Sequence, residues 1–191
     1  MTSPSSNDAT PGAQQAGSPF SGPASFQLDP GASTASFRHK HTFGLLWMTG
    51  TFSGITGSAE ILADGSAHGR IEIPAATIST KNRQRDTHLK SADFFSVEQH
   101  PAIVADITSA TLDGADRVAG AGTLTVAGKT RPLALTARVT EASADAITLT
   151  ADIEIDRADF GMTWNFLSII AGNAYVTVVA RFVRQAAAAG A

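Results

Sequence analysis

The chain contains no cysteine, and this absence excludes several classes of site together. Disulfide scaffolds, thiolate zinc sites, iron–sulfur clusters and cysteine nucleophiles all need a side chain that is missing here. Charged residues are also few. They make up 16% of the 191 residues, and the formal net charge of −3 argues against a general nucleic-acid binder.

Long apolar runs are missing as well. Thr, Gly or Asp interrupts the apolar stretches every few residues, whereas a membrane-spanning helix needs about 20 consecutive apolar residues. The sequence therefore predicts no membrane-spanning helix. Because 43% of the residues are hydrophobic, the chain can bury one core, and we expect a single globular domain with a tail.

The first 24 residues have few side chains that a core would bury. Five Ser, four Pro and three Gly fill half of these positions, and Phe20 is the only large apolar side chain after Met1. We expect residues 1–24 to form a disordered tail, residues 25–184 the folded domain and residues 185–191 a second disordered tail. No apolar segment of a secretion signal precedes Arg38, the first basic residue, so we expect a cytoplasmic protein.

Between the tails, apolar and polar residues alternate, which is typical of β-strands with one buried face. The clearest example is residues 146–156, where every second residue is apolar. The apolar positions of this and three other stretches are Ile147, Leu149, Ala151, Ile153 and Ile155; Ile71 and Ile73; Ile103, Ala105 and Ile107; and Leu133, Leu135, Ala137 and Val139. Each stretch predicts a strand.

Short dipeptides with glycine separate these strands. Asp64-Gly65, Asp113-Gly114 and Gly128-Lys129 tolerate the positive φ angles of tight hairpins. Eight or nine strands joined in this way, without a βαβ rhythm, predict an all-β antiparallel fold. A sandwich and a closed barrel both fit this pattern. We favour an eight-stranded, lipocalin-like barrel, because closure removes exposed sheet edges.

One segment departs from the alternation. Residues 81–90, KNRQRDTHLK, favour a helix that Ser79 or Thr80 would cap, and residues 91–95, SADFF, predict a short turn after it. We therefore expect a short helical insertion in a β protein.

The predicted inner faces mix small and large side chains. Ala105, Ala137, Ala151, Gly120 and Gly122 stand among Ile, Leu and Val, and aromatic residues cluster near residues 37–52, 94–95 and 160–166. Two interpretations stay open: a filled core with large–small packing, or a hydrophobic tunnel with aromatic residues at its mouth. We interpret the two glycines as positions where the barrel wall bends.

Several separated motifs occur in the order typical of one family. They are FQLDPGAS (26–33), Phe37 with Lys40-His41, GTF (50–52), ISTKNRQRDTHLKSADFF (78–95), Pro101, GTLTVAGKTRP (122–132) and RADFGMTWN (157–165). Residues 26–182 thus resemble the YceI family of lipocalin-like, polyisoprenoid-binding proteins. The resemblance implies an extended eight-stranded antiparallel barrel that holds a long isoprenoid chain or a similar amphiphile.

Proteins of this family are commonly exported to the periplasm and often form dimers, so the resemblance also implies a possible homodimer. The sequence departs from the family pattern at two places. We find no export signal, and Asn173-Ala174-Tyr175 replaces the acidic or basic residues that are usual in the last strand.

An apolar lumen can bind such a ligand without specific hydrogen bonds. A tail of ~40 carbon atoms at ~0.3 kcal/mol per heavy atom contributes about 12 kcal/mol, which is equivalent to nanomolar affinity. Aromatic clustering and the resemblance together predict which residues bind the ligand: Phe37, Phe43, Trp47, Phe52, Leu89, Phe94, Phe95, Phe160, Met162 and Trp164.

For the polar head group of the ligand, the candidates are His41, Arg85 and His88. Four basic residues lie within residues 81–90, and Arg85 and His88 share one face of the predicted helix. Two structural interpretations compete with this one. The basic residues form a solvated helix surface, or an Arg85–Asp86 pair pins the insertion to the barrel.

Signals for other chemistry are weak. His39 and His41 project to one face of a predicted strand and would begin a metal site, but no third ligand follows at a recognisable spacing, so we predict no metal and no cofactor. No G-x-S-x-G nucleophile elbow occurs. We therefore predict a non-enzymatic carrier, sequestering or sensing protein for an isoprenoid-type lipid, such as a polyprenyl or quinone-like amphiphile.

Two alternatives to a carrier remain. One is an enzyme that acts on a hydrophobic substrate in the same cavity, with His41, Arg85 or His88 as acid or base. The other is an interaction module whose barrel is filled and whose function lies on the outer surface or in the tail.

Overall fold

The structure, a computed structural model, describes residues 22–41, 46–163 and 173–186. Most of the predicted N-terminal tail, residues 1–21, lies outside this part. The strands are β1 (Ala24–Leu28), β2 (Thr34–His41), β3 (Leu46–Phe52), β4 (Thr56–Ile61), β5 (Ala67–Pro74), β6 (Ala102–Asp113), β7 (Arg117–Val126), β8 (Lys129–Ala142), β9 (Ala146–Ile155) and β10 (Ala174–Arg184). Three helices accompany them: η1 (Ala75–Thr77), α1 (Arg83–Lys90) and η2 (Arg157–Phe160).

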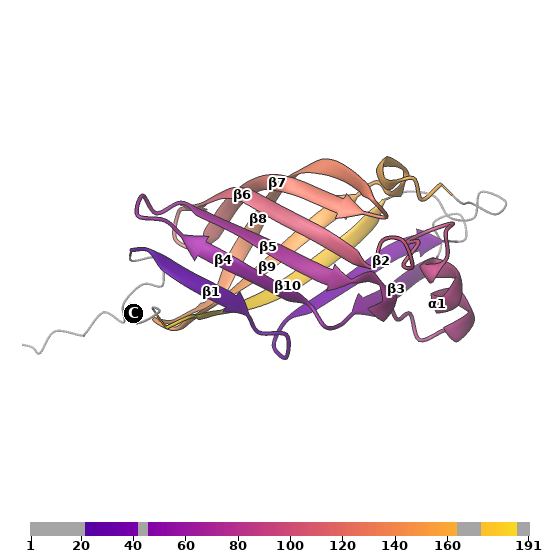
Figure 1. Ribbon diagram of the computed structural model, residues 1–191, viewed down its shortest axis with the longest axis horizontal. Helices are drawn as coiled ribbons and strands as arrows, with labels where there is room; N and C mark the ends of the chain where they lie inside the picture. Colours follow the sequence, from indigo (N-terminus) through magenta and orange to yellow (C-terminus); the bar gives the residue numbers. More distant parts are fainter. Residues whose placement is uncertain (1–21, 42–45, 164–172, 187–191) are drawn as a thin grey trace, which may run out of the picture.

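These ten strands form a closed antiparallel barrel with eight strand positions (Figure 1). Residues 26–28 of β1 pair with residues 182–184 of β10, and residues 34–39 of β2 pair with residues 174–179 further along the same strand. β1 and β2 therefore share one position in the wall. β4 and β3 share the next position, because they pair with β1 and β2 respectively. The predicted eight-stranded barrel is confirmed.

Consecutive strand positions run in opposite directions, so the connections alternate between the two ends of the barrel (Figure 1). The turn end carries the tight connections 62–66, 114–116 and 143–145. The helix end carries η1, α1 and η2. Gly65, Gly114 and Gly128 adopt positive φ angles of 82°, 76° and 73°, as the hairpin dipeptides predict.

The alternating apolar residues of the sequence do face inward. The predicted strand at residues 146–156 is β9, and its apolar positions all border the barrel interior. Gly122 lies opposite a register shift between Ile107 and Ser109, where a Cβ atom would collide with the backbone oxygen of Asp106. Only glycine permits this close approach, which supports the interpretation of Gly122 as a bend in the wall.

The helix α1 begins two residues later than predicted, and its cap is Asn82 rather than Ser79 or Thr80. The Asn82 side chain accepts a hydrogen bond from the backbone N–H of Arg85 at 3.1 Å. Lys81 has a φ of 59°, in the left-handed region, and the Thr80 hydroxyl bonds to side chains of the helix instead of its backbone. The chain therefore turns sharply before the helix starts.

The helical insertion lies where β3 and β5 are not paired with each other. β4 pairs with β5, but in the described residues β3 has no partner on that side except Ser79. Thr51 and Ser79 exchange two backbone hydrogen bonds of 2.9 Å each. This bridge fastens the segment before α1 to the wall.

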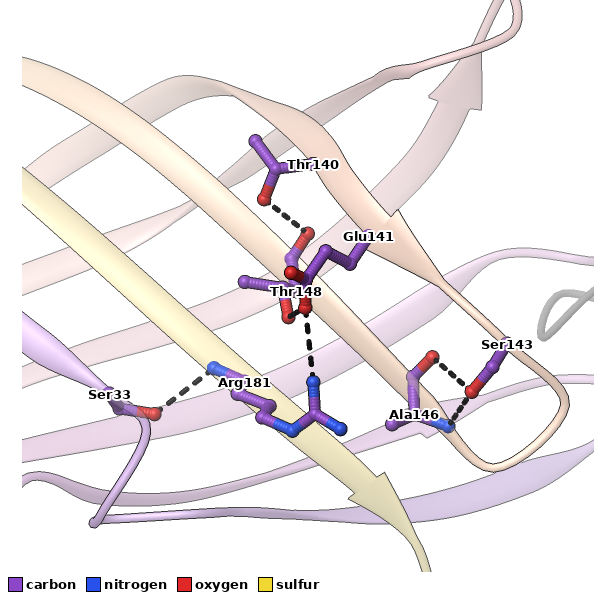
Figure 2. Close-up of polar contacts among 7 residues, drawn as sticks. All are labelled: Ser33, Thr140, Glu141, Ser143, Ala146, Thr148 and Arg181. Carbon is purple, nitrogen blue, oxygen red and sulfur yellow. Dashed lines mark hydrogen bonds and ion pairs between the residues drawn. The ribbon is translucent and has the colours of Figure 1, made fainter.

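Polar side chains connect β8, β9 and β10 on the outside of the barrel near the turn end (Figure 2). Glu141 follows a register shift in the β8–β9 pair, and its carboxylate accepts hydrogen bonds from Thr148 and from Arg181, both at 3.1 Å. The backbone N–H of Arg181 donates to the Ser33 hydroxyl at 3.0 Å. Through Arg181 of β10, these contacts connect the loop between β1 and β2 to β8 and β9.

Candidate ligand-binding cavity

The inward side chains enclose an elongated cavity with a volume of about 370 Å³. It is bordered by five alternate residues of β9, from Ile147 to Ile155, and by five of β10, from Ala174 to Phe182. Eight residue steps at ~3.3 Å correspond to about 26 Å of strand, so the cavity follows most of the barrel length. Its volume lies within the usual range of small-molecule sites, and the barrel is not filled from end to end.

Small side chains help to keep this space open. Ala105, Ala137 and Ala151 all border the cavity, as the mixed pattern of sizes predicts. Ala137 and Ala151 are direct partners across the β8–β9 pair. Two methyl groups side by side make a smooth stretch of wall where larger residues would fill the lumen.

Large buried side chains border the cavity at the turn end. Phe26, Ile61, Ile147 and Phe182 come from four strands and are each less than 7% exposed. Their side chains meet inside the barrel next to the turns, so this end of the cavity is dry and apolar.

Aromatic rings border the cavity at the helix end. Phe52 lies 5.7 Å from Phe37 and 5.8 Å from Phe95, measured between ring centroids, and the second pair is edge-to-face. Seven of the ten residues predicted to contact the ligand border the cavity: Phe37, Phe52, Leu89, Phe94, Phe95, Phe160 and Met162. Their contact with a ligand stays a prediction.

Trp47, which was also predicted to contact the ligand, does not border the cavity. Its side chain is 47% exposed and lies on the outer face of β3. Met48 and Phe52 face inward, and alternation along the strand then directs Trp47 outward. Phe43 and Trp164 lie outside the described residues. His41 ends β2, but its side chain is likewise outside the described part.

Arg85 and His88, two of the predicted head-group residues, border the cavity at the helix end. The Arg85 guanidinium donates to the Thr80 hydroxyl at 2.7 Å and to the Thr80 carbonyl at 2.9 Å. The Thr80 hydroxyl in turn donates to Asp86 at 2.5 Å. Arg85 and Asp86 are therefore linked through Thr80, which supports the interpretation that this part of α1 is fastened to the barrel.

The Thr80–Asp86 contact also holds the carboxylate in its charged form. Hydrogen bonds from the hydroxyl and the backbone N–H of Thr80, and the nearby charge of Arg85, lower the pKa of Asp86. His88 is placed by a different set of contacts. Its Nε2 lies 3.3 Å from an Asp93 carboxylate oxygen, and its ring meets Phe94 edge-to-face at 5.1 Å.

Two polar residues that the sequence did not single out for ligand contact also border the cavity at the helix end: His39 and Arg157. His39 is 3% exposed, and its Nδ1 lies 3.3 Å from the carbonyl oxygen of Asn173. Arg157 begins η2, and burial lowers the pKa of its guanidinium. Alternation with Ala35 and Phe37 was the available signal for His39; no comparable signal existed for Arg157.

Ser58, His68 and Arg70 border the same cavity from β4 and β5, but they present no polar side chain to it. Their side chains lie on the exposed outer face. Arg70 pairs there with Glu72 and Asp106, and His68 lies 3.3 Å from Glu60. The polar side chains that border the cavity are thus gathered at the helix end: His39, Arg85, His88 and Arg157.

Within residues 22–41, 46–163 and 173–186, no three His, Asp or Glu residues are grouped so that they would hold a metal ion. His39 faces the cavity rather than a cluster of such ligands. None of the helices in the same part of the chain has the length and hydropathy that crossing a bilayer requires.

Comparison with known proteins gives one family and several similar structures. The model of the YceI-like domain matches residues 26–182. Over 106 residues the chain is 33% identical to Protein YceI of Escherichia coli O157:H7, and over 105 residues it is 30% identical to a UPF0312 protein of Azotobacter vinelandii. Each match spans 54% of this chain, and only about half the length of the relative, 54% in both.

The similar structures extend over more of the chain. BcnA of Burkholderia cenocepacia superposes with a TM-score of 0.72 at 16% identity, covering 81% of this chain and 98% of BcnA. A polyisoprenoid-binding domain from Saccharophagus degradans superposes with a TM-score of 0.69 at 18% identity, covering 85% of this chain and 99% of that domain. At these identities the likeness shows a shared fold.

Proposed function

Because this chain belongs to the YceI-like domain family, we propose that it binds and carries, or sequesters, a long-chain isoprenoid-type lipid in the barrel. The observation that carries the proposal is the elongated apolar cavity, which has polar side chains at one end. Such a cavity suits an amphiphile with a long tail and one small head group. The polyisoprenoid-binding domain from Saccharophagus degradans, which has the same fold, supports this class of ligand.

The position of the polar groups orients the ligand. The tail lies along the alanines of β6, β8 and β9 and ends near Phe26 and Phe182 at the turn end. The head group lies at the helix end, where Arg85, His88, His39 and Arg157 offer N–H donors. A phosphate, a hydroxyl or a quinone carbonyl supplies the acceptor oxygen that these donors match.

The first experiment identifies the bound molecule. Protein purified from cells is extracted with organic solvent, and the extract is analysed by mass spectrometry. We expect a polyprenyl or quinone-type lipid in stoichiometric amount. Recovery of no lipid, together with no saturable uptake of a dansyl-labelled polyprenyl probe, would contradict the proposal and favour an interaction module.

A matched pair of variants shows whether the probe enters the lumen. Ala137→Phe places a ring in the cavity, because the Ala137 side chain borders it and is 4% exposed. Thr136→Phe places the same ring on the outer face, since Thr136 is exposed and adjacent on β8. We expect Ala137→Phe to weaken probe binding at least ten-fold and Thr136→Phe to leave it unchanged. Equal binding by both variants would exclude the lumen as the site.

The same preparations distinguish a carrier from an enzyme. A carrier returns the probe chemically unaltered after incubation. A change in the mass of the probe that His88→Gln abolishes, with binding retained, would favour an enzyme instead. A cytoplasmic location and dimer formation stay predictions, which cell fractionation and light scattering test.

A further inference from the structure

We propose that the helix end of the barrel docks on an anionic lipid bilayer through four exposed or half-exposed side chains: Arg38, Lys40, Trp47 and Tyr175. We call this cluster the aromatic–cationic patch. It lies on the outer faces of β2, β3 and β10, and it is separate from the proposed binding of lipid inside the barrel.

The four side chains of the patch form one connected cluster. The Arg38 guanidinium lies 5.0 Å from the ring centroid of Trp47 and 5.5 Å from that of Tyr175. The Lys40 ammonium lies 5.0 Å from the Trp47 centroid, and the two aromatic rings are 6.0 Å apart. Strand register produces this arrangement, because Arg38 is paired with Tyr175 and Lys40 with Trp47.

This composition matches the interface between a bilayer and water. Trp and Tyr are enriched at that depth, where the ring contacts acyl chains and the polar edge stays hydrated. Lys and Arg keep their charge at the head groups and are attracted to anionic lipids. A Trp that is 47% exposed between two cations has the chemistry of such an anchor.

Within the described part of the chain, neither Arg38 nor Lys40 has an ion pair, although Glu154 is paired with Tyr175 of the patch across β9 and β10. Asp152 and Glu154 on β9 are the carboxylates of the adjoining outer face, and they accept hydrogen bonds from Thr177 and Asn173.

Charge also orients the barrel. The three connections at the turn end contain three carboxylates and no basic residue: Asp64, Asp116 and Asp145. An anionic surface repels these connections and attracts the patch, although the turn end also carries the exposed Arg117 and Arg138 on β7 and β8. The patch and the cavity lie on opposite faces of the same strands, because the neighbouring residues His39, Met48 and Ala174 face inward. Docking by the patch therefore brings the helix end of the cavity to the bilayer.

Vesicle flotation of the full chain tests the proposal. We expect the protein to float with vesicles of phosphatidylcholine mixed with phosphatidylglycerol, and not with phosphatidylcholine alone. Added salt should release it, because the attraction to the head groups is screened. Failure to float with the mixed vesicles at low salt would overturn the proposal.

Charge-matched variants locate the contact. Removal of two basic residues at about one kcal/mol each corresponds to a loss of about 30-fold in partitioning, so we expect this loss for Arg38→Gln/Lys40→Gln. The control is Arg117→Gln/Arg138→Gln, which removes two exposed cations that are paired across β7 and β8 at the turn end. Equal partitioning of the two double variants would overturn the proposal.

The aromatic contribution has a control of the same kind. Trp47→Ala should weaken partitioning about ten-fold, since a large apolar side chain is no longer buried in the interface. Leu112→Ala removes an apolar side chain of similar exposure, 42%, from the turn end, and we expect no change. Thermal unfolding and lipid extraction of the patch variants should match the unmutated protein. The two proposals can therefore fail separately. A protein that does not bind vesicles can still bind lipid in the lumen, and a protein without lipid in the lumen can still bind vesicles.

Discussion

The two ends of the barrel are built in different ways. At the turn end, tight hairpins join complete strand pairs, and buried rings such as Phe26 and Phe182 converge inside. At the helix end, β3 separates from β5, and η1, α1 and the turns that follow occupy the connection between β5 and β6. The first end is closed by strand pairing and apolar packing; the second combines buried side chains such as Phe94 and Phe160 with the polar contacts of Thr80.

This difference separates folding from ligand handling. A helix of eight residues, as in α1, is too short to be stable by itself in water. It depends on the Asn82 cap, the Thr80 contacts and burial of Leu89. Segments held by few buried contacts open at lower free energy than the core. We therefore expect the helix end to open locally while the turn end stays folded.

The largest effect is expected at the turn end. Phe182→Ala removes a ring that is 5% exposed and should lower the free energy of unfolding by about 3–5 kcal/mol. Urea unfolding followed by circular dichroism measures the change. The control, Val183→Ala, alters the next residue of β10, whose side chain lies outside and is 36% exposed, and should cost less than about 1 kcal/mol. Similar losses in both variants would mean that the turn end is not the packed end.

A smaller and more local effect is expected at the helix end. Thr80→Val removes a buried hydroxyl that bonds both Arg85 and Asp86, and should lower stability by about 1–3 kcal/mol because the two half-buried partners lose hydrogen bonds. Hydrogen exchange should accelerate in α1 and not in β9. Thr87→Val is the control, since the Thr87 hydroxyl bonds only the exposed carbonyl of Arg83. Uniform acceleration over the whole barrel would contradict independent opening of the helix end.

The Thr80 contact also predicts a dependence on pH. The pKa of Asp86 is lowered in the folded protein relative to the unfolded chain, where Asp has a pKa of about 3.9. Its stabilising contribution is therefore present above that pH and is lost as the pH falls through the folded value. The stability difference between the unmutated protein and Thr80→Val should shrink between pH 5 and pH 2, approximately, as the carboxylate takes up a proton. A constant difference over this range would show that Asp86 is not the partner that matters.

Strand alternation predicted the wall of the barrel well, because one buried face imposes a period of two on the sequence. β9 was expected at residues 146–156 and runs from Ala146 to Ile155. The interruptions between β1 and β2 and between β3 and β4 were not predictable, since they depend on pairing with strands distant in sequence. The cap of α1 was misassigned because Thr80 is used by side chains instead of the helix backbone.

The outward direction of the Trp47 side chain could have been predicted from the sequence. Trp47 and Phe52 are five residues apart, and an odd separation on one strand places two side chains on opposite faces. Clustering of aromatic residues along the chain does not show on which face of a strand each one lies. The same rule would have added His39, which shares a face with Phe37. Arg157 could not be found in this way, because it lies in η2 after the strand ends.

The smallest effect is expected from the outer polar contacts at the turn end (Figure 2). Glu141→Gln keeps an acceptor for Thr148 but removes the charge that faces Arg181, and these two side chains are 69% and 36% exposed. An ion pair so exposed contributes little, so we expect a loss of less than about 1 kcal/mol that disappears in high salt.

Glu98→Gln is a control for the loss of one negative charge, since Glu98 is exposed at the helix end and forms no ion pair in the described residues. If Glu141→Gln alone cost as much as Phe182→Ala, the polar contacts across β8, β9 and β10 would hold the turn end together. The contrast between a packed end and a polar end would then have to be reversed.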